Sequence, residues 1–264
     1  MPTPTRAALL AAWGTAVLQG GADVDEAVAA VERSDEAHLV CHGLDGPEEL
    51  AETLTGLREQ GLVGLRLALP APGDLIGLRG PAEVNRAALA AGEAVLGVRR
   101  RQDPAEAAVP ALVPAVTTFG PAGDQGHCVT WRLLAAVGAP WDGPSVAEAD
   151  RALREVLREG TTALQRLAVA GGRSGAARAQ ALRRDRAPLR LPGDLDPRAD
   201  ALAERALAVL DAVAAAREDD GGSVTAHAAG ARLAALVPLE RAARRALVAA
   251  CGAGLEAALR QPAR

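Results

Sequence analysis

The hydrophobic residues of the first hundred positions follow two alternating patterns. In residues 46–61 the leucines recur at steps of three and four, which is the spacing of one face of an amphipathic helix. Residues 62–69 instead carry an apolar side chain at every second position, and this alternation is typical of a strand. Pro47 opens the helical segment and Gly61 closes it, because proline suits a first helical turn and glycine adopts the left-handed conformation that ends a helix. The pattern predicts a helix followed by a strand.

The same layout repeats immediately afterwards. Gly80-Pro81 opens a second helical segment, Gly92 closes it, and residues 94–98 form a second apolar run. With an earlier apolar segment at 37–43, the predicted order is strand, helix, strand, helix, strand. Because helices of this length between strands are typical of crossover connections, we expect parallel strands joined by right-handed connections.

Two longer extended runs follow, at 109–116 and 127–137, and a glycine-containing loop joins them. Two such runs in succession predict a hairpin. Pro110 and Pro114 have no N–H to donate, so we expect the first run to lie at an edge of the sheet. Together with the preceding segments, the hairpin predicts a mixed sheet of about five strands.

An apolar run at 7–18 precedes all of these segments. Leu9, Trp13 and Val17 recur at helical spacing within it, so we expect a helix that packs on the domain. The alternative is a cleaved signal peptide, which the single arginine before the run argues against. No apolar run of the sequence is long enough to cross a bilayer.

From residue 145 onward the hydrophobic pattern becomes helical throughout. Ser145 and Glu148 form the S-x-x-E pattern of a capping box, which predicts the start of a helix. Apolar residues then alternate steps of three and four as far as Leu167, the spacing of a helix in a bundle. Asp196-Pro197 predicts the start of a second long helix, because aspartate caps the helix and proline suits its first turn.

A third helix is predicted at 225–236 and a fourth from Pro238 onward, and the four pack as an antiparallel bundle. We expect the glycine cluster at 171–175 to be a flexible link between helices. The predicted fold class is therefore an α/β domain with a mixed sheet at residues 1–144, followed by an all-α helical domain at residues 145–264.

The formal net charge of −4 is unevenly distributed along the chain. Residues 1–98 contain 6 arginines and 14 acidic residues, whereas residues 145–264 contain 19 arginines and 15 acidic residues. Neither half has the strongly basic balance of a dedicated nucleic-acid binder, so we do not expect nucleic acid as the main partner. The 3 cysteines lie far apart without a C-x-x-C pair, which indicates no disulfide framework and suits the cytoplasm.

The loop at 70–86 is the strongest candidate for a ligand site. It is rich in glycine and proline and carries four polar side chains: Asp74, Arg79, Asn85 and Arg86. Open parallel sheets bind ligands beyond the carboxyl ends of their strands, and the helix N-terminus that follows this loop favours an anion. Arg79 or Arg86 would hold a small anion, and Asp74 or His42 would transfer protons. The alternative is a surface connection shaped by its glycines and prolines.

No cofactor motif occurs in the sequence. Neither G-x-G-x-x-G nor the Walker-type G-K-[ST] is present, the latter because the chain has no lysine. His38, Cys41 and His42 are close in sequence, but on a strand the two histidines point to one face and the cysteine to the other. We therefore predict no metal site and no cofactor.

Arginines cluster in the second half of the chain. Residues 166–190 contain seven of them and one acidic residue, a cluster that we expect to lie in solvated loops. Residues 225–250 can be arranged as a helix-turn-helix with Arg241, Arg244 and Arg245 on the second helix, although the turn at 236–238 lacks the usual glycine. A DNA-binding regulator is therefore one alternative function.

The run GLVGLRLALPAPGDLIGL at 61–78 resembles uncharacterised proteins of high-GC bacteria. This resemblance implies no activity and no functional residue. The hypothesis we draw from the sequence is a non-catalytic, cytoplasmic protein that binds a protein partner or a small ligand and has no contact with membranes. The first alternative is an enzyme acting on a small anionic substrate at the 70–86 loop, and the second is the DNA-binding regulator.

Overall fold

The computed structural model describes residues 5–33, 35–43, 46–75, 77–99, 108–121, 124–138, 143–166, 172–186, 188–193, 195–218 and 226–260. Contacts divide the chain into two compact units. The described residues of the first, the α/β unit, fall within 4–142, 190–195 and 251–264, and those of the helical unit within 143–189 and 196–250. The units therefore interleave along the chain. The boundary at residue 144, which separates two continuous halves, stays a prediction.

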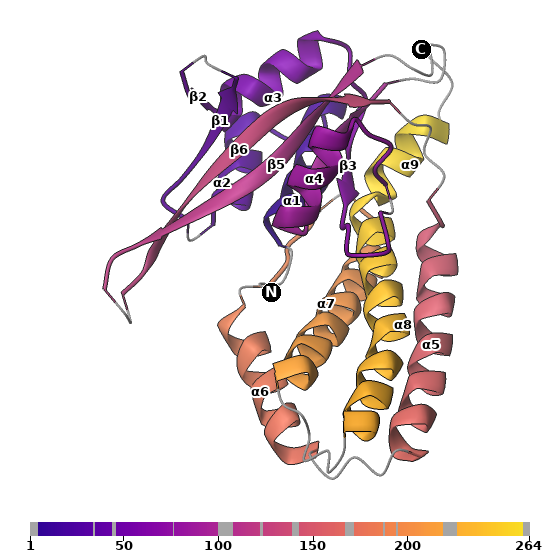
Figure 1. The fold of residues 1–264 in the computed structure, drawn as a ribbon. Helices are drawn as coiled ribbons and strands as arrows, with labels where there is room; N and C mark the ends of the chain where they lie inside the picture. The colour runs from indigo at the N-terminus through magenta and orange to yellow at the C-terminus, as the bar shows by residue number, and fades with distance from the viewer. Residues whose placement is uncertain are drawn as a thin grey trace. The chain divides into compact units, whose positions relative to one another are not determined.

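The α/β unit contains one six-stranded mixed sheet, so the predicted fold class is confirmed. Its strands are β1 (Ala37–His42), β2 (Glu48–Glu49), β3 (Gly64–Ala68), β4 (Ala94–Val98), β5 (Ala108–Phe119) and β6 (Gly126–Val137). The order across the sheet is β2-β1-β6-β5-β4-β3 (Figure 1). Only β1 and β6 are parallel among the described neighbours. The predicted hairpin is confirmed, because β5 and β6 pair along their whole length.

The prediction of parallel β3 and β4 is wrong, because these neighbours are antiparallel, with Gly64 opposite Val98. Between β3 and β4 the chain runs along the length of the strands twice, first as a loop and then as a helix, whereas a parallel connection runs along it once. The loop first returns to the edge where β3 begins, where the carbonyl of Gly80 accepts a hydrogen bond from Val137 N–H at 3.3 Å. Helix α4 (Ala82–Ala91) then runs back, so that β4 starts beside the end of β3. Parallel strands need a single crossover.

The prediction of a sheet edge at Pro110 and Pro114 is also wrong, because β5 lies between β4 and β6. The described ladder of β5 with β4 contains only Ala111 and Leu112. The two prolines flank that short ladder, so neither removes a hydrogen bond from it. Proline is tolerated in a strand where the neighbour takes no bond from its nitrogen.

The two sides of the sheet, face A and face B, are both covered by helices. Face A carries Val40, Trp131 and Leu67, and face B carries Leu39 and Leu96. Helices α1 (Arg6–Gln19), α2 (Val24–Glu32) and α3 (Leu50–Glu59) belong to face A. Close packing is visible at α1, because a Cβ on its Gly14 would lie 2.4 Å from Cδ1 of Leu65 in β3.

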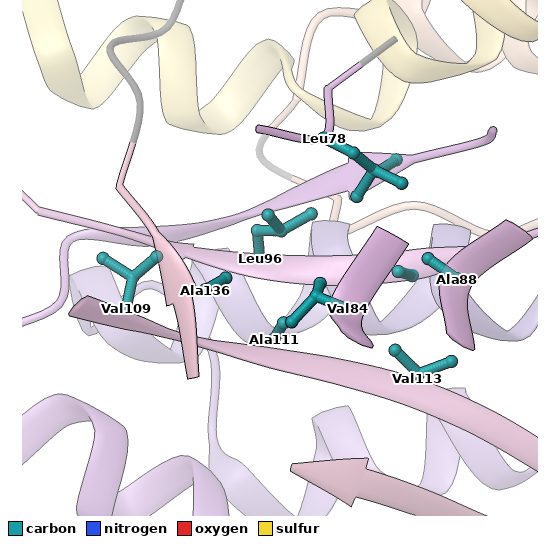
Figure 2. Packing of buried hydrophobic residues seen from close by; sticks show 10 residues of the cluster. Leu78, Val84, Ala88, Leu96, Val109, Ala111, Val113 and Ala136 are labelled. Atoms are coloured by element: carbon teal, nitrogen blue, oxygen red, sulfur yellow. The ribbon is translucent and has the colours of Figure 1, made fainter. Parts of the chain in front are cut away.

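Face B is covered by α4 and by the preceding loop. Figure 2 shows Val84 and Ala88 of α4 next to Leu96, Ala111 and Val113 of the sheet, in one apolar cluster. Leu78 of the loop joins the same apolar cluster and is 8% exposed. The loop that the sequence offered as a ligand site therefore contributes to the core.

The helical unit contains α5 (Val146–Arg166), α6 (Gly172–Asp185), α7 (Pro197–Glu218) and most of α8 (Ala226–Cys251), while α9 (Ala253–Arg260) belongs to the α/β unit. The capping box is confirmed, since Ser145 N–H donates to Glu148 Oε2 at 2.9 Å. The seam of α5 is confirmed as well: Leu153 is fully buried, and a Cβ on Gly160 would touch Leu239 of α8. Leu167, the last seam position, lies outside the described residues.

Two predictions for this half are wrong. The residues at 172–175 begin α6 instead of forming a link, and Gly171 lies outside the described residues. The third and fourth helices are one helix, α8, with Pro238 inside it. Leu236 and Leu239, on either side of the proline, are both buried in the same apolar cluster, which favours a continuous helix over a break. None of the described helices is long and apolar enough to cross a membrane.

Candidate functional site

Four of the five predicted site residues lie together at the connection from β3 to α4. Asp74 is buried in a tight turn in which its backbone exchanges two hydrogen bonds with Ala71, at 2.9 and 2.8 Å. Asn85 Oδ1 accepts the N–H of Gly80 at 3.1 Å and so fastens the loop to α4. Arg79 and Arg86 are exposed. The Asn85 side chain and the Asp74 backbone thus shape the connection, and binding of an anion there stays a prediction.

The fifth residue, His42, does not join them. It ends β1, which three strands separate from β3 in the sheet order. The two strands also run in opposite directions, so His42 lies at the edge of the sheet opposite to the end of β3. His42 Nε2 instead lies 2.9 Å from Glu48 Oε1. The expectation that His42 transfers protons at the loop is therefore wrong. Because β3 and β4 are antiparallel, the argument that open parallel sheets bind ligands at this loop does not apply either.

Arg66 is a buried residue of this region that the sequence analysis missed. It lies in the middle of β3 and is 5% exposed. Its Nη2 donates to the carbonyl of Gly77 at 2.7 Å, so the arginine ties the strand to the loop that covers face B. A charged residue inside an otherwise apolar strand was the available signal, because a buried arginine requires partners.

A chain of polar contacts on face A links the start of α1 to β1 and β6. The Arg6 guanidinium donates two hydrogen bonds of 2.7 Å to the Asp35 carboxylate. Asp35 Oδ2 lies 3.0 Å from Nε2 of His38, and the indole N–H of Trp131 donates to Nδ1 of the same ring at 3.2 Å. Since Nδ1 is the acceptor, the proton of the neutral ring is on Nε2 and is donated to Asp35.

The electrostatics of this chain favour a charged Asp35 and a neutral His38. Burial lowers the pKa of His38 and outweighs the opposing effect of Asp35. Burial acts to raise the pKa of Asp35, but the hydrogen bonds from Arg6 and His38 together lower it. The hydrogen bond to Asp35 raises the pKa of Arg6. Both ring nitrogens of His38 therefore have partners within the core, and the ring is fully buried. This chain of contacts holds the helix and strands together and is not positioned to contact a substrate.

Glu93 adds an acidic group next to the same helix terminus. It precedes β4, and its Oε2 accepts the N–H of Ala7 in the first turn of α1 at 3.1 Å. Burial raises the pKa of Glu93 to about 7, although the Ala7 hydrogen bond and the Arg6 charge favour the ionised form. Helix N-termini bind carboxylates through their free N–H groups. Glu93 therefore fastens α1 to β4 and changes charge near neutral pH.

The described part of the chain offers no cluster of metal ligands. No group of three or more His, Cys, Asp and Glu side chains there could hold a metal ion. The register places His38 and His42 on face A and Cys41 on face B, as strand geometry dictates. His38 is paired with Asp35 and His42 with Glu48.

Of the arginine-rich segment at 166–190, residues 172–185 form a helix, α6, and not a solvated loop. Beyond its end, Arg186 lies 3.3 Å from Glu204 and 3.4 Å from the fully buried Asp211, both on α7. The helix-turn-helix is absent because α8 continues through the proposed turn. Arg241 and Arg244 of α8 have interaction partners within the chain.

One part of face B is left partly uncovered, on β1 and β6. We call it the open face, and it consists of Leu39, Cys41, Cys128 and Thr130. Leu39 is 37% exposed and the other three are half-buried. Two charged residues border it on the same face: Glu49 of β2, opposite Leu39, and Arg132 of β6, which lies 3.6 Å from Glu83 of α4. The open face is therefore a small surface of four uncharged residues, bordered by charged ones, at the margin of the core that α4 covers.

Two family models match the chain. The model described as Rv1486c-like protein, N-terminal domain, matches residues 7–145, and the model described as Rv1486c-like protein, C-terminal domain, matches residues 147–248. The match extends well beyond the run at 61–78. No curated protein and no solved structure matches the chain. Because the N-terminal model alone covers more than half of the sequence, the chain belongs to the Rv1486c-like family and contains both of its domains.

Proposed function

We propose that this chain is a non-catalytic protein that acts by binding a protein partner on the open face. The observation that carries the proposal is the exposure of Leu39, a residue that is 37% exposed on β1, the strand next to the edge strand β2. Exposed apolar side chains on a regular, rigid surface are the usual anchors of protein contacts. Since the four residues of the open face are uncharged and the acidic Glu49 lies beside Leu39, the partner presents an apolar surface of its own rather than a phosphate or an acidic peptide.

The internal arrangement of the titratable groups supports binding over catalysis. His38 has both ring nitrogens engaged in the core, and His42 is paired with Glu48. In the 70–86 loop, Asn85 bonds Gly80 and both Asp74 and Arg79 have partners within the chain. A general acid or base must reach a substrate proton, and these groups already serve the fold.

A cytoplasmic location is part of the same proposal. All 3 cysteines of the chain lie among the described residues, and none of them forms a disulfide. Two of them, Cys41 and Cys128, are half-buried on the open face, where an oxidising compartment would expose them to reaction.

The test is capture of partners from native cytosol with three versions of the full chain, followed by mass spectrometry and titration with the purified partner. Leu39→Arg places a charge on the open face, whereas Leu75→Arg places the same charge on another exposed leucine, 45% accessible in the β3–α4 loop. We expect the wild type and Leu75→Arg to bind the same partner and Leu39→Arg to bind it at least tenfold more weakly. Equal binding by Leu39→Arg, or recovery of no partner together with turnover of a metabolite, would refute the proposal.

A further inference from the structure

Strand β5 extends beyond the neighbour on one of its sides. It pairs with β6 from Ala108 to Phe119, but its described ladder with β4 contains only Ala111 and Leu112. Figure 1 shows β5 and β6 continuing together past the other strands. Among the described residues, none pairs with residues 115–119 on the side facing away from β6. We call Ala115–Phe119 the edge segment.

The edge segment lacks the features that protect strand edges from pairing. Natural edges carry charges, prolines or bulges, or are very short. The other side of the sheet follows this rule, since β2 consists of only Glu48 and Glu49. The edge segment reads Ala-Val-Thr-Thr-Phe, without charge, proline or glycine, and all of its residues are exposed. Such a composition favours the extended conformation and offers backbone N–H and C=O groups to a further strand.

We propose that the edge segment pairs antiparallel with the same segment of a second copy of this chain, around a twofold axis at Thr117. In this register Thr117 lies opposite its own copy, Val116 opposite Thr118, and Ala115 opposite Phe119. Threonine pairs and pairs of a β-branched residue with threonine are favourable across antiparallel strands. A segment that matches itself in this way is what a closed twofold interface requires.

The position of Phe119 explains why its partner is small. Its ring lies over Gly126 of β6, where a Cβ would be 2.5 Å from Cζ. The ring therefore covers face B of its own hairpin and is 45% exposed on the outer side. Across the twofold axis it meets Ala115, whose methyl group leaves room for the ring. A bulky residue at 115 would collide with it.

The pairing contains few residues, so the dimer belongs to the class of small, weak interfaces. It uses the backbone edge of β5 and not the open face on β1 and β6, so it does not rest on the proposed function.

The experiment is analytical ultracentrifugation of the full chain from about 5 to about 500 µM, the range in which weak dimers dissociate. Thr117→Lys and Thr117→Glu each place two like charges face to face at the twofold axis. We expect each variant alone to dissociate at least tenfold more readily than the wild type, and a one-to-one mixture of the two to associate again because the charges become complementary. Thr55→Lys, on the exposed side of α3, is the matched control and keeps the wild-type behaviour.

Hydrogen exchange of the wild type at several concentrations tests the same pairing without any substitution. Amides of residues 115–119 that face away from β6 are expected to exchange more slowly at the highest concentration than at the lowest. A wild type that is monomeric at every concentration would overturn the proposal, as would protection of these amides that is independent of concentration. Dimers of Thr117→Lys as tight as those of the wild type would overturn the register.

Discussion

The indole N–H of Trp131 donates a hydrogen bond of 3.2 Å to Nδ1 of His38, across 93 positions of sequence. Both side chains are buried on face A. The contact fixes which nitrogen of His38 carries the proton, and this proton is donated to Asp35. Trp131 on β6 thus orients a polar chain that ends at Arg6 in the first turn of α1.

Trp131→Phe tests this contact. The variant keeps an aromatic ring but leaves Nδ1 of His38 buried without a donor, which costs about 1–3 kcal/mol in addition to the lost packing. Urea denaturation measures the free energy of unfolding. The double variant with His38→Leu has no unpaired ring nitrogen. Its loss of unfolding free energy should therefore be smaller than the sum of the losses of the two single variants. Simple additivity would contradict a functional hydrogen bond.

The lowered pKa of His38 predicts a loss of stability in acid. Its folded pKa lies below the ordinary value of 6.5, so the unfolded chain binds more protons. The stability from the neutral ring is therefore present above pH 6.5 and is lost as the pH falls through the folded pKa. We expect His38→Gln, which takes up no proton, to show a shallower decline of unfolding free energy between pH 7 and 5 in the same denaturation experiment. An unchanged slope would assign the decline to other groups.

Glu93 predicts the opposite dependence on pH. Its pKa rises from 4.5 to about 7 in the folded state, so folding favours the protonated acid. The contribution is full below pH 4.5 and is lost as the pH rises through about 7. This loss is on the order of 3 kcal/mol, because one pKa unit corresponds to about 1.4 kcal/mol.

Glu93→Gln keeps an oxygen that can accept the N–H of Ala7 and removes the charge. We expect the variant to be more stable than the wild type at pH 8 and to lose this advantage near pH 4.5, measured by denaturation at both values. A variant that is less stable than the wild type at pH 8 would show that the carboxylate charge itself, through Arg6, holds the helix terminus.

A threonine of α1 provides a hydrogen-bond acceptor for the free edge of β3. Thr15 is 1% exposed, and its Oγ1 accepts the N–H of Leu65 at 2.9 Å. Thr15→Val keeps the shape but removes the acceptor, so we expect a loss of about 1–3 kcal/mol in unfolding free energy. Thr55→Val is the control, because that hydroxyl is exposed and only bonds the carbonyl of Ala51 in its own helix. Equal effects of the two substitutions would rule out a role of Thr15 at the strand edge.

Local patterns predicted the elements of this chain better than their assembly. Alternation in 62–69 gave β3, and the Ser145–Glu148 pair gave the start of α5, because both signals act within a few residues. The direction of β4 depends on how residues 70–80 lie on face B, which rests on contacts of Leu78 and Arg66 with distant segments. Periodicity carries no record of such contacts.

The same limit applies to the candidate site and to α8. Asp74 and Asn85 were found because polar residues in a loop are visible in the sequence, but their partners within the loop are not. Arg6, Asp35 and Trp131 lie on separate segments, so nothing local linked them to His38. Pro238 predicted a break because proline removes one helical hydrogen bond, yet burial of the leucines around it outweighs that loss.

Two glycines of the chain differ sharply in the space around them, one crowded in β4 and one open in α3. Gly97 lies on face A, where a Cβ would come within 2.2 Å of Cδ2 of Leu62 and 2.8 Å of Cγ of Pro110. Gly97→Ala therefore forces the proline ring and the strand apart, an overpacking that costs about 1–3 kcal/mol or more. Gly56 lies inside α3 with nothing within 4 Å of its added Cβ.

Gly56→Ala accordingly has only the helix propensity of alanine to gain, up to about 1 kcal/mol. The two single-methyl substitutions are thus expected to move the unfolding free energy in opposite directions, which thermal or urea denaturation of both variants measures. A Gly97→Ala variant as stable as the wild type would mean that Leu62 and Pro110 can move aside at no cost. The close approach of Gly97 in β4 to Pro110 in β5 would then not limit the stability of the sheet.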